Sequence, residues 1–126
     1  MERLINLNTL NLALCEGRHE IPQATDGYIF NEIAPELLKN PEKLEKTVFY
    51  RIWGKCYDNN FVKVDPNWDE CDEVPLLISN VHINLYVTGL TVALISVINA
   101  MRDEDVTITL YHYDKDTSSY YSQEVM

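Results

Sequence analysis

Two groups of residues in the last third of the chain have side chains and spacing suited to ligand chemistry. Thr88 and Gly89 follow a strand-like run and lead through Thr91 into an apolar, helix-like stretch. A strand that turns through Thr-Gly into a helix leaves backbone N–H groups free at the helix N-terminus, where the helix dipole attracts anions. His112 and Asp114 end the next strand-like run; a histidine exchanges protons near neutral pH, and a carboxylate can orient it.

The elements expected around these residues place both groups at one edge of a sheet. Residues 82–87 and 106–114 are predicted strands, and the apolar run 92–102 is predicted to be the helix between them. If the two strands pair in parallel, the crossover should be right-handed, and ligands of such units collect beyond the carboxyl ends of the strands. The plainer interpretation is that Thr91 only caps the helix and His112 has no catalytic role. The ligand-binding residues predicted from this pattern are Thr88, Gly89, Thr91, His112 and Asp114.

A C-terminal hairpin is expected to complete this unit. Residues 115–118 read as a turn, and residues 119–125 should return as an antiparallel strand. The period of two along a strand places Tyr111 and Tyr113 on the face opposite His112. Two interpretations of the tyrosine-rich hairpin stay open, simple strand propensity or an aromatic platform that stacks a base. The tyrosines concerned are Tyr111, Tyr113, Tyr120 and Tyr121.

The expected helix 92–102 is apolar on nearly every side. Such a helix is buried on more than one side, so it should either pack between layers or support a contact between subunits. We therefore predict self-association through the C-terminal unit, as a homodimer or a higher homo-oligomer.

The first two thirds of the chain give weaker signals. Asn40 is placed to cap a helix that begins at Pro41 and runs through residue 46. A mixed segment with helical tendency precedes it at residues 28–39, interrupted at Pro35. Strands are expected at residues 3–14 (one strand or a hairpin), 48–53 (ended by Gly54) and 61–64. The predicted fold class is α+β or α/β, a small single domain over residues 1–126 with a mixed sheet and a C-terminal strand–helix–strand–strand unit.

The composition of the chain excludes some classes of binding partner. The chain has 126 residues with 46% hydrophobic residues and a net charge of −10. Binding to duplex nucleic acid needs a basic face, so ten Lys and Arg residues against twenty Asp and Glu residues argue against it. No apolar run approaches the roughly 20 residues that span a bilayer. The first residues lack a basic region followed by an apolar core, which predicts a cytoplasmic protein with no membrane partner.

No metal or cofactor is expected. Cys15, Cys56 and Cys71 are an odd number at wide spacing without a Cys-x-x-Cys pair, which is typical of reduced thiols. The acidic loop at residues 65–73 opens like a calcium loop, but Glu70 stands where that loop needs glycine. Phosphate-loop, dinucleotide and Gly-x-Ser-x-Gly motifs are also absent from the sequence.

Residues 82–125 resemble the core of a small CRISPR-associated ring-nuclease family. The resemblance is carried by Thr88-Gly89, the apolar helix with Ala93-Leu94, and the strand that ends in Tyr113-Asp114. It implies a single-domain protein that binds, and in that family cleaves, cyclic oligoadenylate, a second messenger of antiviral defence. The chain departs from the family pattern after Asp114, where Lys115-Asp116 replaces Pro and Arg, and its helix lacks the family's histidine. The resemblance therefore implies messenger binding, with phosphodiester cleavage that is slow if it occurs.

Two functions of different classes follow from the sequence. The first is recognition of a small anionic ligand, such as a cyclic oligonucleotide messenger, in a defence or anti-defence setting. The second is an acidic protein–protein interaction module, for example a phage-encoded inhibitor without a small-molecule ligand. A ligand site requires a concave pocket with a cation beside Thr88 and Gly89, whereas an inhibitor requires a convex acidic face.

Overall fold

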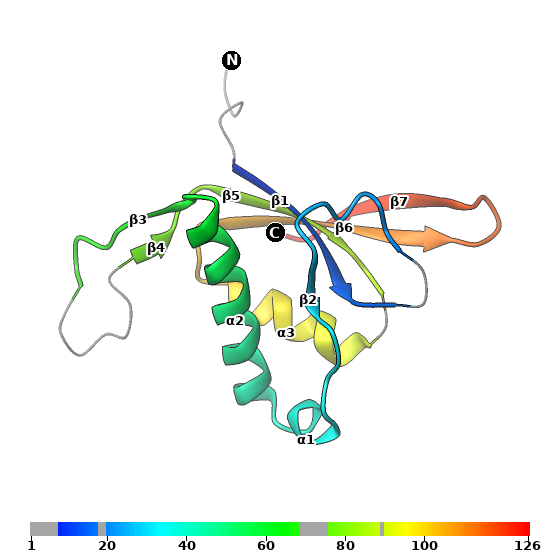
Figure 1. The fold of residues 1–126 in the computed structure, drawn as a ribbon, viewed down its shortest axis with the longest axis horizontal. Helices are drawn as coiled ribbons and strands as arrows, with labels where there is room; N and C mark the ends of the chain where they lie inside the picture. The colour runs from blue at the N-terminus through cyan, green and yellow to red at the C-terminus, as the bar shows by residue number, and fades with distance from the viewer. Residues whose placement is uncertain (1–7, 18–19, 69–75, 89) are drawn as a thin grey trace, which may run out of the picture.

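The computed structural model describes residues 8–17, 20–68, 76–88 and 90–126. Its main feature is a mixed five-stranded sheet with helices packed against one face (Figure 1). The strands, in spatial order, are β2 (Tyr28–Phe30), β1 (Asn8–Cys15), β5 (Val81–Tyr86), β6 (Val106–Asp114) and β7 (Ser119–Glu124). The first four run parallel and β7 pairs antiparallel with β6. The predicted fold class is confirmed.

The C-terminal unit agrees closely with the sequence pattern. β5 leads into α3 (Thr91–Met101), then β6, and β7 returns as the second strand of the hairpin. β5 and β6 pair in parallel with Ile83 opposite Ile108, so the crossover joins neighbouring strands. Ser118 closes the hairpin turn with φ 52°, in the left-handed region that such turns require.

The longest helix overturns one prediction. α2 (Pro41–Asp58) includes the expected strand 48–53 and also Gly54. Its start was predicted correctly, because Asn40 Oδ1 accepts a hydrogen bond from the Lys43 N–H at 3.2 Å and Pro41 is the first helical residue. A helical spacing of four residues then places one set of side chains in the core, and tertiary packing outweighs the strand propensity of the Val and aromatic residues. The buried set is Leu44, Val48, Ile52 and Cys56.

The N-terminal part takes the simpler of the two expected forms, and residues 3–7 of the expected strand lie outside the described residues. β1 is one strand that pairs in parallel with β5, so residues 8–15 do not form a hairpin. Residues 28–39 contain β2 and the short α1 (Pro35–Leu38), and Pro35 begins that helix rather than interrupting one. A separate two-stranded sheet joins β3 (Val62–Val64), the predicted strand 61–64, to β4 (Leu76–Ile78) in antiparallel pairing.

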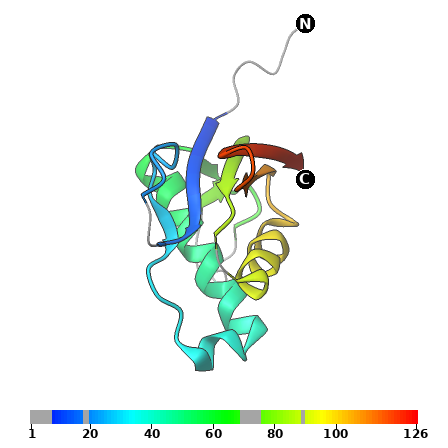
Figure 2. The same cartoon turned by 90° about the vertical axis from the view of Figure 1, so that its right-hand side faces the viewer.

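The core lies between the sheet and the helices α2 and α3, which pack together on one face (Figure 2). Alternate residues of the central strands point into it and are fully or almost fully buried, namely Leu10, Leu12, Leu14, Ile83, Leu85, Ile108 and Leu110. The opposite face of the sheet, here called the open face, carries the other alternate residues. No helix of the described part of the chain is long and apolar enough to cross a membrane.

Helix α3 packs against both the sheet and α2, as expected of a helix buried on more than one side, but one apolar side remains exposed. Ala93, Val97 and Met101 are fully buried against the sheet, whereas Val92 and Ile95 are 49% and 51% exposed. The apolar outer side is thus available to solvent. Self-association through this helix stays a prediction.

Candidate functional site

Among the predicted ligand-binding residues, Thr88 and the His112–Asp114 pair lie on different faces of the sheet. Register places Tyr86 opposite Tyr111, and Thr88 continues β5 on that same open face. His112 and Asp114 follow Ile108 and Leu110 in the alternation, so they belong to the face that carries the helices. The structure therefore does not bring Thr88 together with the His112–Asp114 pair.

The strand-end pair has local partners of its own. The Nε2 atom of His112 lies 2.9 Å from Oε1 of Gln123 on β7, and its ring packs against Tyr121 with centroids 5.2 Å apart. Asp114 Oδ1 accepts a hydrogen bond from the Asp116 N–H at 2.9 Å, which shapes the hairpin turn. The partners of both side chains lie within the β6–β7 hairpin, and Asp114 does not orient His112.

The hydroxyl of Thr88 extends the pairing of β1 with β5. It donates to the Cys15 carbonyl at 2.8 Å and accepts from the Cys15 N–H at 3.1 Å. The backbone register pairs Ala13 with Tyr86, so two positions further on it would pair Cys15 with Thr88. The threonine side chain substitutes there for a backbone partner, because β5 has already ended at Tyr86.

The strand-to-helix connection is present between β5 and α3, with Gly89 itself outside the described residues. Leu90 is the N-cap residue and no side chain caps the helix, so the expected cap by Thr91 is wrong and Thr91 is the first helical residue. The Leu90 N–H points to the Cys15 thiol and favours its ionised form, but burial is the larger effect and raises the pKa of that thiol. The protein's own sulfur thus occupies part of the space beside this helix N-terminus.

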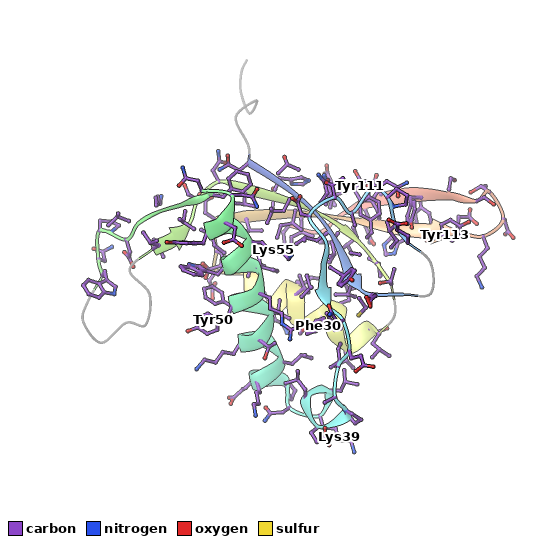
Figure 3. All side chains as sticks on the ribbon, in the orientation of Figure 1. Phe30, Lys39, Tyr50, Lys55, Tyr111 and Tyr113 are labelled. Carbon is purple, nitrogen blue, oxygen red and sulfur yellow. The ribbon has the colours of Figure 1, made fainter. Side chains whose placement is uncertain are left out.

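A groove on the open face is the strongest candidate for a binding site. It has a volume of about 970 Å³ and is lined by tyrosines from β5, β6 and β7, together with Thr88 and residues of the loop between β1 and β2. Tyr86 stacks on Tyr111 with ring centroids 4.8 Å apart and an interplanar angle of 17°. Tyr120 meets the edges of two neighbours, at 5.1 Å from Tyr86 and 5.3 Å from Tyr113. Tyr111 and Tyr113 both come from β6 (Figure 3).

Polar groups line the rim of this tyrosine groove on two sides. Lys115 and the hydroxyls of Ser118 and Ser119 come from the hairpin turn, and Glu20 and Gln23 come from the opposite loop. Tyr113 is 51% exposed, so its ring is accessible from the groove. An aromatic wall with a few polar groups at its edge is the usual composition of a small-molecule site.

Beside the groove, the open face carries a network of hydrogen-bonded polar side chains from β1, β5 and β6. The Nδ1 atom of His82 lies 2.7 Å from the Thr107 hydroxyl, and its Nε2 lies 3.1 Å from both Asn84 Oδ1 and the Thr109 hydroxyl. The Asn84 amide donates to Asn11 Oδ1 at 2.9 Å. Both ring nitrogens of His82 therefore have partners within the sheet surface.

Burial in the groove predicts a pH effect on stability. Desolvation raises the pKa of Tyr86, and the neighbouring Tyr111 and Tyr120 add to the shift. A raised folded-state pKa contributes stability that is present below the unfolded value of about 10 and is lost as the pH rises through the folded value. Urea unfolding at increasing alkaline pH should therefore show a steeper loss for wild type than for Tyr86→Phe. Equal slopes for the two proteins would contradict a buried Tyr86 hydroxyl.

Sequence reasoning found part of this groove. The alternation of β6 placed Tyr111 and Tyr113 on one face, and the hairpin register adds Tyr120, while Tyr121 lies on the other face beside His112. The pattern gave no signal for Tyr86 as a stacking partner, which depends on the β5–β6 register. It also gave none for the loop that forms the second wall, which follows β1 and depends on the β1–β5 pairing. Within the described ranges, no group of three or more His, Cys, Asp or Glu residues is arranged to hold a metal ion.

Comparisons with known proteins identify no relative from which a function could be inferred. No protein-family model, no curated protein and no solved structure matched the chain. The resemblance to ring nucleases accordingly stays a prediction from the sequence.

Proposed function

We propose that the tyrosine groove binds a small anionic ligand that carries a planar base, and that cyclic oligonucleotide messengers such as cyclic oligoadenylate are the first class to test. The observation that carries this proposal is the cluster of four tyrosines around one groove of about 970 Å³. Tyrosine faces stack on nucleic acid bases and contribute roughly 1–3 kcal/mol per base.

Charge at the rim favours the anionic part of such a ligand locally. Lys115 is the cation among the described residues of the groove lining, and Ser118 and Ser119 add hydroxyl groups from the same hairpin. The net charge of −10 repels anions at long range, so recognition depends on these near groups. The groove extends over the same strand end that the sequence predicted, with the tyrosine side of β6 in place of its His112 side.

The proposal is for binding, with cleavage at most slow. Among the described residues of the groove lining, Lys115 and Glu20 are the charged side chains and none is a histidine. General acid–base cleavage of a phosphodiester needs a group that titrates near neutral pH beside the reacting atoms. A protein of this design would hold a messenger away from its receptor, in keeping with the defence or anti-defence setting expected from the sequence.

A pair of tyrosine variants tests the groove. Tyr113→Ala removes an exposed ring from the groove wall, whereas Tyr121→Ala removes an equally exposed ring, 51% against 58%, from the other face of the same hairpin. In calorimetric titrations with cyclic oligoadenylates, cyclic dinucleotides and AMP, Tyr113→Ala should weaken binding by about 5- to 150-fold. Tyr121→Ala should bind like wild type.

Two results would reject the proposal. One is no heat from wild type with any of these compounds, which would favour the acidic interaction module. The other is an equal loss of affinity in Tyr113→Ala and Tyr121→Ala, which would place the ligand elsewhere. Incubation of wild type with cyclic oligoadenylate, followed by chromatography, separately measures cleavage.

A further inference from the structure

A second groove lies beside the edge strand β2, away from the tyrosine groove. It has a volume of about 500 Å³ and is formed between β2, the residues that follow it, and one side of α2. Two cations line it, Arg51 and Lys55, which stand four residues apart and therefore on adjacent turns of the same helix face. Figure 3 shows Lys55 on the upper part of α2 and Tyr50 on the same helix.

Both cationic head groups are held by neutral partners. Arg51 Nη1 donates to the Ile29 carbonyl at 2.8 Å, and Lys55 Nζ donates to the Asp26 carbonyl at 2.8 Å. The guanidinium group also lies over the Phe30 ring, 5.2 Å from its centroid. These contacts fix the positions of two charges but do not neutralise them, and like charges at this helical spacing repel each other.

The donors that remain are suited to an oxyanion. A guanidinium group has five N–H donors and an ammonium group has three, so each head group keeps donors beyond its carbonyl bond. Asn31 and Tyr50 add an amide and a phenol to the same lining. A phosphate group offers several acceptor oxygens and two negative charges, and a fixed arginine beside a lysine is a favourable arrangement for it.

We propose that this α2–β2 groove binds a phosphate group, with Arg51 and Lys55 as its two charged contacts. Lys55 is only partly exposed, which strengthens its interaction with an anion. Glu32 and Asp58 line the same groove and oppose anion binding. Both carboxylates are exposed, as is Arg51, so solvent weakens this repulsion without abolishing it. The site is separate from the tyrosine groove and does not depend on the function proposed for it.

Thermal unfolding with inorganic phosphate tests this site, with chloride at equal ionic strength as the reference. Phosphate should raise the melting temperature of wild type in a concentration-dependent manner. Lys55→Gln should weaken phosphate binding roughly tenfold or more, because it removes one charged contact and keeps a polar side chain. Lys39→Gln, which removes an exposed cation far from the groove, should bind like wild type (Figure 3).

Two further variants keep the test decisive. Asp58→Asn removes a repelling carboxylate without touching either cation, so it should bind phosphate more tightly than wild type. Tyr113→Ala should leave the phosphate response intact, because its ring lines the other groove. The proposal is overturned if chloride stabilises wild type as much as phosphate does, if Lys55→Gln responds like wild type, or if Asp58→Asn shows no gain.

Discussion

Replacing Ile83 by alanine should lower the free energy of unfolding by about 2–5 kcal/mol. Ile83 has no exposed surface and lies at the centre of the sheet, paired with Leu10 of β1 and Ile108 of β6. Its side chain points toward α3 and α2, so alanine leaves a cavity where the sheet meets both helices. Urea unfolding followed by circular dichroism measures the loss.

Ile95→Ala is the matched control for this prediction. It removes the same atoms from a side chain that is 51% exposed on the outer side of α3, so at low protein concentration the change should be within about 0.5 kcal/mol. Comparable losses for the two variants would contradict the exposure of the outer side of α3. A concentration-dependent loss in Ile95→Ala alone would point to the predicted contact between subunits.

Replacing Thr88 by valine should cost about 1–3 kcal/mol of stability, although the two side chains have nearly the same shape. Valine cannot form the pair of hydrogen bonds that joins the Thr88 hydroxyl to the N–H and carbonyl of Cys15. Both backbone groups are partly buried at the end of β1, and an unsatisfied buried polar group bears its full desolvation cost. Urea unfolding again provides the measurement.

Two control variants, Thr88→Ser and Thr91→Val, separate the loss of these hydrogen bonds from nonspecific destabilisation. Thr88→Ser keeps the hydroxyl and should retain most of the stability, whereas Thr88→Val should not. Thr91→Val changes an exposed side chain that caps nothing and should be close to neutral. Stability of Thr88→Val equal to that of wild type would mean that the hydroxyl is not the partner of Cys15.

The contrast between the correct and incorrect elements has a physical reason. The strand–helix–strand–strand unit was predictable because each element is marked locally, by alternation in β6, by a turn at residues 115–118 and by an apolar run in α3. The segment 48–53 was mistaken for a strand because its local composition favours one. Its helical conformation is stabilised by Val48 and Ile52 against the sheet, and that contact is invisible until the sheet is known.

The candidate site, like the fold, was predictable only in part. The sequence located the correct strand ends and the tyrosines Tyr111 and Tyr113, but it favoured His112 and Asp114, which have partners on the other face. What separates the two groups is the side-chain alternation combined with the position of the helices on a single face. The second wall of the groove, at residues 20–23, follows β1, and the pairing of β1 with the central strand β5 joins segments about seventy residues apart in the chain.

That separation has a consequence for folding order. β5, α3, β6 and β7 are contiguous in sequence and can pair as soon as residues 81–124 are available, whereas β1 must close a long loop to reach β5. Contacts between distant segments slow folding, so β1 should dock late, onto a C-terminal nucleus that is already formed. During synthesis, residues 8–15 leave the ribosome before residues 81–86, so β1 waits for its partner β5. Until that partner arrives, their apolar side chains remain exposed, which makes this strand the segment most dependent on protection from aggregation.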